Sequence, residues 1–360
     1  DLFVSDAKAE AAVRTLVGRC AADWRARGVD PAAYNTVESA GDLEDIRREI
    51  GAERVRLVGT SYGSELALEM IRRNGNHVER AVLAGVRGPS TALKLPSTLD
   101  LELRRVASMI ARDSTYATIL PDPQGLVLAL LDVLDRKPFT ITVTPREGGE
   151  KREYRVGSTG LRMVLQSDLP DANAITLVPA MLATMKEGNP KIFLSRLRAV
   201  HEAMARGTTL MSLAVNCASG WDSERLERVR DEAGSSPFAN IRNIYLSPAL
   251  CDSVRPANLG AAFRAPIVSE IPVLFISGSM DATTPPFEAE EIAWGFPNGL
   301  HMIVHNGFHE TLGIREVQRS VTEYFSGKDI RGRGIVMPPP KFLSVTEALK
   351  RVTEEPAPAR

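Results

Sequence analysis

The sequence lacks several features that would assign a chain to a special class of protein. Its formal net charge at pH 7 is −1, from 44 lysine and arginine residues against 45 aspartate and glutamate residues. A balance so close to zero gives no general attraction to nucleic acid or to an anionic membrane surface. No apolar run approaches the roughly 20 residues that a membrane-spanning helix requires. We therefore expect neither a nucleic-acid partner nor a membrane partner.

Cysteine is also scarce, because only Cys20, Cys217 and Cys251 occur in the 360 residues. Their spacing and their neighbours do not suggest a metal site. Two arrangements are open at this point. Either all three cysteines are buried thiols, or Cys217 and Cys251 form a bridge and Cys20 pairs with something outside this chain.

The rest of the composition is that of an ordinary globular chain, with 44% hydrophobic and 25% charged residues. A core of this size needs neither a metal nor a disulfide for its stability. The length of 360 residues fits one large domain, or a core that carries an insertion.

The order of the expected elements indicates an α/β fold. A buried strand over 54–59, a helix over about 62–74 and a second buried strand over 78–86 follow one another. Strands that alternate with helices point to a parallel sheet covered by helices. The same alternation returns later, with strands at 271–278 and 300–305.

Between these α/β segments, the chain reads as mostly helical, with one β-hairpin around a Gly-Gly turn. The simplest architecture is an α/β core split by a large helical cap insertion. In the C-terminal tail, Ser344-Val-Thr-Glu347 is typical of a capping box that opens a short helix. The predicted parts are a first core segment at 1–89, a cap at 90–265, a second core segment at 266–327 and a tail at 328–360.

A serine stands between two glycines at the turn from the first strand into its helix. The pattern Gly59-x-Ser61-x-Gly63 matches a nucleophile elbow. We expect the glycines because the serine would sit in a strained turn, where side chains on either side would clash with strand and helix. Such a turn presents the Ser61 hydroxyl at the carboxyl end of the sheet, and the Tyr62 N–H can face a developing oxyanion. A chance match is the alternative, and the position between a strand and a helix counts against it.

A nucleophilic serine needs a base; of the five histidines, His305 ends the last expected strand and His309 follows it in the loop. A histidine just past a late strand is where the chain order Ser, Asp or Glu, His places the base. We prefer His309 to His305, because Gly307 gives the loop freedom to turn His309 toward the serine. The alternative is a zinc site from the H-x3-H spacing on a helix, and Asn306-Gly307 breaks any such helix.

The acid is expected between the serine and the histidine, and Asp281 follows a strand that runs into a polar loop. A loop aspartate before a helix is usually an N-cap or a turn residue. Thr284 can serve as that N-cap instead, which leaves Asp281 free. A carboxylate at a strand end can accept the imidazole N–H, fix its tautomer and stabilise the imidazolium. Ser61, Asp281 and His309 together predict a catalytic triad.

These residues resemble the proline iminopeptidase and tripeptidyl aminopeptidase branch of the α/β-hydrolases. The resemblance covers most of residues 15–325, and the elbow and the acid loop are its most specific parts. The matching segments are "YNTVESAGDLEDIRREIG" (34–51), "LVGTSYGSELAL" (57–68), "VERAVLAGVRGP" (78–89), "IPVLFISGSMDATTPP" (271–286), "HNGFHET" (305–311) and, more weakly, "AVNCASGWD" (214–222).

The resemblance implies a serine hydrolase with Ser61 as nucleophile, His309 as base and Asp281 as orienting acid, beneath a helical cap. It also implies that Cys217 and Cys251 are bonded, which favours a secreted or periplasmic location. This chemistry needs no metal or organic cofactor. The implied activity is that of an exo-acting aminopeptidase, with a peptide or small molecule as substrate. The alternatives are a carboxylesterase and a non-catalytic binding protein on the same scaffold.

The chain departs from the family in two places. Relatives carry an early His-Gly-Gly-Pro-Gly type segment that supplies a second oxyanion donor, and this chain has none. We therefore expect a preceding segment of about a hundred residues to complete the core, since the elbow strand would otherwise be an exposed sheet edge. Relatives also often carry an acidic residue where Ser219 stands. Glu202, Asp222 and Glu224 could replace it in holding a substrate ammonium, although each also fits a solvated helix face.

Overall fold

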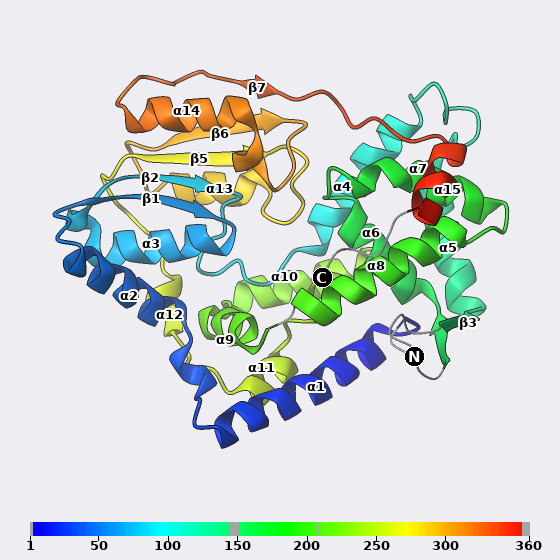
Figure 1. Cartoon of the computed structure of the whole chain (residues 1–360), viewed down its shortest axis with the longest axis horizontal. Coiled ribbons are helices and arrows are strands. Elements are labelled where there is room, and N and C mark those ends of the chain that lie inside the picture. The colour runs from blue at the N-terminus through cyan, green and yellow to red at the C-terminus, as the bar shows by residue number, and fades with distance from the viewer. Residues whose placement is uncertain (1–2, 144–150, 208, 355–360) are drawn as a thin grey trace.

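The computed structural model describes residues 3–143, 151–207 and 209–354. Its central element is a five-stranded sheet in the order β1-β2-β5-β6-β7, in which every neighbouring pair is parallel. Helices lie on both sides of this sheet (Figure 1). The predicted α/β class, a parallel sheet covered by helices, is confirmed. The strands are β1 (Val55–Thr60), β2 (Val78–Ala84), β5 (Val273–Gly278), β6 (Leu300–His305) and β7 (Ile335–Val336).

The central strands are buried on both faces, which explains why they read as continuous apolar runs. On one face, Leu83 and Phe275 pack against α3 and α13. On the other face, Val82 and Ile276 pack against α14. Alternate residues of each strand therefore belong to different cores. The helices next to the sheet are α2 (Thr36–Glu49), α3 (Tyr62–Asn74), α13 (Pro286–Ala293) and α14 (Arg315–Phe325).

The two edges of the sheet differ from each other. Within the described residues, β1 pairs with β2 alone, and Val58 in this strand is 58% exposed. The predicted exposed edge at the elbow strand is therefore present. At the other edge, the Met337 N–H donates to the His305 carbonyl at 2.9 Å, and β7 joins the sheet. The sequence did not predict this fifth strand, which lies in the segment assigned to the tail.

The chain between β2 and β5 is mainly helical and builds a second layer with its own apolar core. Its antiparallel hairpin joins β3 (Phe139–Val143) to β4 (Arg152–Val156). The predicted Gly-Gly turn of that hairpin lies outside the described residues. The helices of this layer are α4 (Pro96–Ile110), α5 (Pro123–Arg136), α6 (Ser158–Asp168), α7 (Val178–Lys186), α8 (Lys191–Gly207), α9 (Leu210–Ser219), α10 (Ser223–Ser235), α11 (Pro248–Val254) and α12 (Gly260–Arg264).

The first and last helices pack on this helical layer (Figure 1). The first helix, α1 (Asp6–Ala26), lies against α9 and α11. The last helix, α15 (Val345–Glu354), packs on α7 and α8. The predicted capping box opens α15, because the Ser344 N–H donates to Glu347 Oε2 at 2.8 Å and the Glu347 N–H donates to Ser344 Oγ at 3.3 Å. No helix in the described ranges has the length and apolarity needed to cross a membrane.

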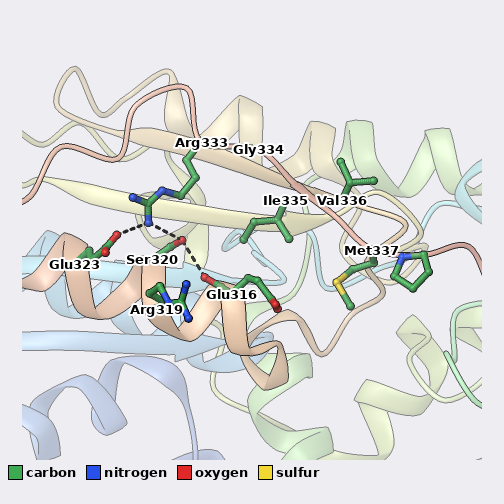
Figure 2. Close-up of a pocket in the computed structure, with 10 residues that line it drawn as sticks. Glu316, Arg319, Ser320, Glu323, Arg333, Gly334, Ile335, Val336 and Met337 are labelled. Atoms are coloured by element: carbon green, nitrogen blue, oxygen red, sulfur yellow. Dashed lines mark hydrogen bonds and ion pairs between the residues drawn. The ribbon is translucent and has the colours of Figure 1, made fainter.

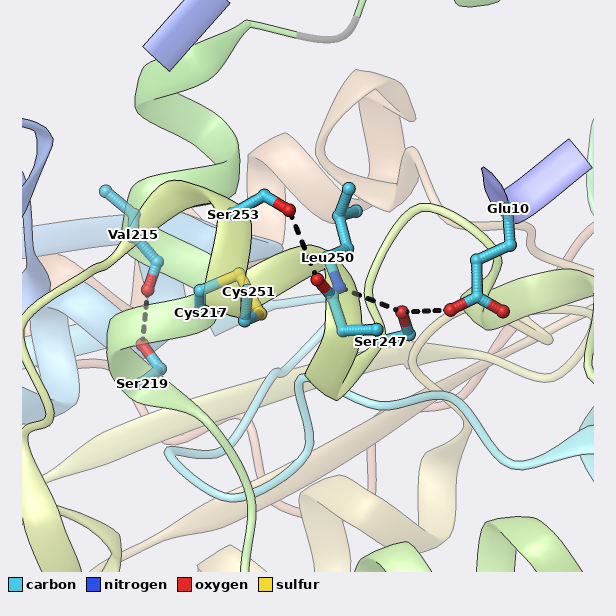
Figure 3. Close-up of a disulfide and its surroundings, with 9 residues drawn as sticks. Glu10, Val215, Cys217, Ser219, Ser247, Leu250, Cys251 and Ser253 are labelled. Atoms are coloured by element: carbon cyan, nitrogen blue, oxygen red, sulfur yellow. Dashed lines mark hydrogen bonds between the residues drawn. A yellow bond between two sulfur atoms is a disulfide. The ribbon is translucent and has the colours of Figure 1, made fainter. Parts of the chain in front are cut away.

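A disulfide joins Cys217 in α9 to Cys251 in α11, with the two Cα atoms 5.4 Å apart (Figure 3). Cys20 is an exposed free thiol. The pairing implied by the family resemblance is thus confirmed, and the alternative of three buried thiols is wrong. The bond closes a segment between positions 34 residues apart, so it restricts the unfolded chain and holds α9 in place against α11.

The double variant Cys217→Ala, Cys251→Ala should lose about 2–4 kcal/mol of unfolding free energy, because the unfolded chain gains freedom. Equilibrium denaturation in urea measures this loss. Cys20→Ala is the control, and as an exposed change it should alter stability by less than about 0.5 kcal/mol. Equal stability of the double variant and the parent protein would contradict a structural role for the bond.

Candidate active site

Ser61 occupies a sharp, strained turn between the end of β1 and the start of α3. Its φ of 51° and ψ of −121° are unusual for a residue with a side chain. The turn is fixed on both sides, because the Ser61 N–H donates to the Ala84 carbonyl at 3.0 Å and the Ser61 carbonyl accepts from the Ser64 N–H at 2.9 Å. Tyr62 is the first residue of α3, so its N–H has no partner within the helix. The backbone has the strand-to-helix turn that the motif predicts.

The two flanking glycines have different surroundings. A Cβ at Gly59 would lie 2.7 Å from the Gly63 carbonyl carbon, so only glycine allows the strand and helix to approach this closely. A Cβ at Gly63 would meet no described atom within 4 Å, apart from its own helix backbone. The expectation that side chains at both positions would clash is therefore right for Gly59 and wrong for Gly63. Gly63 contributes its backbone to the contact.

Asp281 and His309 form a direct hydrogen bond at the ends of β5 and β6. The His309 Nδ1–H donates to Asp281 Oδ2 at 2.7 Å. The Asp281 carboxylate is buried, and its Oδ1 accepts the Thr283 N–H at 2.7 Å and the Thr284 N–H at 3.0 Å. This arrangement fixes the tautomer of the imidazole and leaves Nε2 as an acceptor.

The sequence suggested Thr284 as the N-cap of the following helix, but Thr284 does not cap it. The α13 helix has Pro285 at its N-cap position and no side-chain cap. The Thr284 hydroxyl instead donates to Asp281 Oδ2 at 2.6 Å and lies 3.1 Å from His309 Nδ1. A proline in the first turn has no N–H to satisfy, so the helix needs this cap less. Thr284 consequently holds the carboxylate and the imidazole together.

Gly85 brings the histidine next to the serine turn. It follows β2 directly and has a φ of 52°. A Cβ at Gly85 would lie 2.9 Å from His309 Cε1 and 3.2 Å from the Thr284 hydroxyl. The residue before it, Ala84, accepts the Ser61 N–H. Ser61 and His309 therefore both border the end of β2, where a side chain at position 85 would displace the imidazole.

The Asp281–His309 bond shifts the pKa of both partners. Burial opposes protonation of the imidazole, but the hydrogen bond and the charge of Asp281 outweigh it and raise the pKa of His309 above its usual value of 6.5. Burial favours the neutral form of Asp281, but the hydrogen bond and charge of His309 lower the pKa of this carboxyl below its usual value. Near neutral pH, the site thus holds an ionised acid beside a histidine that can gain or lose a proton.

A buried ion pair fixes the first turn of α3, which follows Ser61. Arg87 Nε lies 2.6 Å from Glu65 Oε2, and the Arg87 guanidinium lies 5.7 Å from the centre of the Tyr62 ring. The Glu65 carboxylate also accepts from the Thr36 hydroxyl at 3.2 Å and from the Ser219 hydroxyl. The first turn of α3 is in this way tied to α2, to α9 and to the segment after β2. An acidic residue in place of Ser219 would face a buried carboxylate, which this chain avoids.

The acidic residues proposed to bind a substrate ammonium have other contacts. Glu202 Oε1 lies 2.9 Å from Arg198 Nε in α8. Asp222 is the exposed N-cap of α10 and accepts the Arg225 N–H at 2.7 Å. Glu224 is exposed in the first turn of the same helix. No described contact joins them to Ser61 or His309, and their role in substrate binding stays a prediction.

The described residues include no group of three or more histidine, cysteine, aspartate or glutamate side chains arranged to hold a metal ion.

A separate hollow of 580 Å³ lies between α14 and the segment around β7 (Figure 2). Arg333 and Glu323 form an ion pair in it, and the Arg333 guanidinium also donates to Ser320 Oγ at 3.3 Å. None of the residues Ser61, Asp281 or His309 lines this hollow. It contributes nothing to the chemistry of the candidate site.

The sequence did not predict the roles of Gly85, Glu65 and Arg87. Gly85 had one usable signal, because a glycine directly after a buried parallel strand lies at the edge where such folds bind ligands. Arg87 follows the same strand and had the same signal. Glu65 had none, since a glutamate in the first turn of a helix is normally a solvated residue that interacts with the helix dipole.

The different surroundings of the two glycines give a direct test of the elbow. Gly59→Ala should destabilise the protein by about 1–3 kcal/mol, because the new methyl group overlaps the backbone of α3. Gly63→Ala should not lower stability, because its Cβ has room and alanine favours a helix. Thermal unfolding of both variants measures the difference. Equal destabilisation by the two changes would contradict the close contact between Gly59 and the backbone of α3.

A comparison with family models agrees with this architecture. A family model described as TAP-like protein, of the Abhydrolase_4 type, matches residues 236–334, which include Asp281 and His309. No curated protein sequence matches the chain. Among solved structures, MGS-M2, an α/β hydrolase enzyme from a Medee basin deep-sea metagenome library, is similar at 15% identity and a TM-score of 0.33, over 84% of this chain and 75% of its own. A thermophilic esterase from Thermogutta terrifontis is similar at 15% identity and a TM-score of 0.30, over 81% and 69%. The parallel sheet, the strained serine turn and the family match together show an α/β-hydrolase fold with a helical cap.

Proposed function

We propose that this protein is a serine hydrolase that cleaves an ester or amide through an acyl-enzyme on Ser61. The observation that carries the proposal is the position of the Asp281–His309 pair against Gly85, next to the strained turn that presents Ser61. A positioned base, an acid that orients it and a serine held in a strained turn form the arrangement that activates a hydroxyl nucleophile.

The reaction follows from the protonation states of these groups. His309 Nε2 accepts the proton of the Ser61 hydroxyl while Oγ forms a bond to the acyl carbon. The carbonyl oxygen becomes an oxyanion, which the Tyr62 N–H stabilises. The imidazolium then gives its proton to the leaving alcohol or amine as the bond to the acyl carbon breaks. A water molecule, deprotonated by His309, releases the acid and restores Ser61.

Two substrate classes fit this chemistry, and a different observation supports each. The match of residues 236–334 to the TAP-like model supports an exo-acting aminopeptidase. The Arg198 contact of Glu202, the N-cap role of Asp222 and the exposed position of Glu224 support a carboxylesterase, because an aminopeptidase needs carboxylates that are available to hold the substrate ammonium. The Cys217–Cys251 bond supports a secreted or periplasmic location.

A fluorophosphonate probe tests the nucleophile. We expect covalent labelling of one serine, mapped to Ser61 by peptide mass spectrometry, since only an activated hydroxyl attacks the probe readily. Ser61→Ala should abolish labelling and lower the hydrolysis of aminoacyl anilides and short-chain esters by at least about 10³-fold. Ser326→Ala, at an exposed serine in the turn after α14, is the matched control and should behave like the parent. Undiminished labelling of the Ser61→Ala protein would contradict the proposal, and failure of the probe to label Ser61 in the parent protein would favour a binding protein.

The pH dependence tests the role of Asp281. His309 must be neutral to act as a base, and its pKa lies above 6.5, so kcat/KM should rise with pH through an apparent pKa above that value. Asp281→Asn should lower kcat by about 10⁴-fold through the wrong tautomer. If the variant keeps some activity, its kcat/KM should rise at a lower pH than in the parent, because the carboxylate that stabilises the imidazolium is gone. An unchanged pH dependence in this variant would show that Asp281 does not orient the base.

A further inference from the structure

Two cationic side chains beside the acid loop are buried, and neither forms an ion pair with a carboxylate of the described residues. The first is Lys94, in the segment between β2 and α4. Its main chain is fixed, because the Lys94 N–H donates to Asn243 Oδ1 and the Asn243 amide donates to the Lys94 carbonyl, both at 2.8 Å. Arg225 holds the preceding carbonyl, that of Leu93, at 2.7 Å. The Lys94 ammonium is buried and has no hydrogen-bond partner among the described residues.

The second cation is Arg242, which directly precedes Asn243 in the chain. Its Nη2 lies 3.5 Å from the Thr283 hydroxyl, and Thr283 donates its N–H to Asp281. The other terminal nitrogen, Nη1, is buried and bonds to no described group. Arg242 is therefore linked to Asp281 through Thr283, and the neighbouring residue Asn243 links it to Lys94.

The other charged groups around this site form ion pairs with one another. Within the described part of the chain, no such ion pair forms at Lys94 or Arg242, although the charges of Asp281 and Glu288 act on Arg242. Leaving a buried charge unpaired is costly, which makes an anion the natural complement of these two groups. The pairs are Arg87 with Glu65 at 2.6 Å, Arg225 with Glu288 at 2.6 Å, Arg105 with Glu102 at 3.2 Å and His309 with Asp281 at 2.7 Å.

The electrostatics agree with this geometry. Burial lowers the pKa of Lys94 to about 8; the charge of Glu288 opposes this shift, and the charges of Arg87, Arg242 and Arg225 add to it. Burial likewise lowers the pKa of Arg242 to about 10, against the opposing charges of Asp281 and Glu288. The charge of Lys94 opposes protonation of His309, so the ammonium lies within electrostatic reach of the imidazole. An ammonium group of a substrate would be repelled here.

We infer that the site takes an acyl substrate that carries a second, ionised carboxylate, which Lys94 and Arg242 bind. This inference deepens the proposed function and rests on it, because it assumes that Ser61 attacks the ester or amide end of the same molecule. The planar guanidinium of Arg242 suits a carboxylate, and the Lys94 ammonium adds a compact charge. The acyl chain then extends from Ser61 toward the segment between β2 and α4.

Three p-nitrophenyl esters of equal acyl length test the inference: the hemiadipate, the hexanoate and the 6-aminohexanoate. We expect kcat/KM to follow the order anionic, neutral, cationic, with the hemiadipate favoured over the hexanoate by about 10–100-fold. Lys94→Met and Arg242→Met keep the bulk of the side chains and should each reduce that ratio. Lys350→Met, at an exposed lysine of α15, is the control and should leave the ratio unchanged. A ratio near one in the parent protein would overturn the inference.

A binding measurement separates this inference from the proposed mechanism. Adipate should bind to the Ser61→Ala protein in calorimetry, and the affinity should fall in the combined Ser61→Ala, Lys94→Met, Arg242→Met variant. Circular dichroism verifies that the combined variant is folded. Adipate binding without any Ser61-dependent hydrolysis would support the anion site and contradict the mechanism. Hydrolysis of the hexanoate without adipate binding would support the mechanism and overturn the anion site.

Discussion

The parallel register of the sheet is the constraint on which the candidate site depends. Thr60 pairs with Ala84, Ala84 pairs with Ile276, and Gly278 pairs with Val304, so the four long strands end at one edge. Ser61, Gly85, Asp281 and His309 each follow one of these strand ends closely. Because successive strands are separated by a helix or by the whole cap, residues far apart in the sequence meet there. A loss of register at β5 would move Asp281 away from both His309 and Ser61.

Close backbone contacts then determine how near the serine turn, the acid loop and the histidine loop lie to one another at that edge. A Cβ at Gly59 or at Gly278 would each lie 2.7 Å from a carbonyl carbon, that of Gly63 and that of Gly307 respectively. The Met280 N–H also donates to the Gly307 carbonyl at 2.8 Å, which packs the acid loop against the histidine loop. The disulfide fixes α9, whose Ser219 donates to Glu65 beneath the elbow. The strained serine turn is consequently supported from both the sheet and the cap.

The sequence predicted those parts of the structure that have local signals. The helix at 62–74 has the predicted bounds, and the strand expected at 78–86 is β2, because buried parallel strands and helix starts leave distinct patterns. The two-residue β7 left no pattern, and its pairing depends on β6. The Glu65–Arg87 ion pair could not be predicted either, since it requires the folded contact between α3 and the end of β2. Thr284 fitted a cap in sequence, but the buried Asp281 carboxylate beside it is the stronger acceptor for its hydroxyl.

The acyl-enzyme on Ser61 is the central intermediate of the proposed mechanism, and trapping it tests that mechanism most directly. The protein would be mixed with a slowly deacylated p-nitrophenyl ester, quenched in acid within milliseconds, digested and mapped by mass spectrometry. We predict a burst of one p-nitrophenolate per chain and one acyl group on the peptide that contains Ser61. Turnover with no acyl group on Ser61, or with the acyl group on another residue, would contradict it.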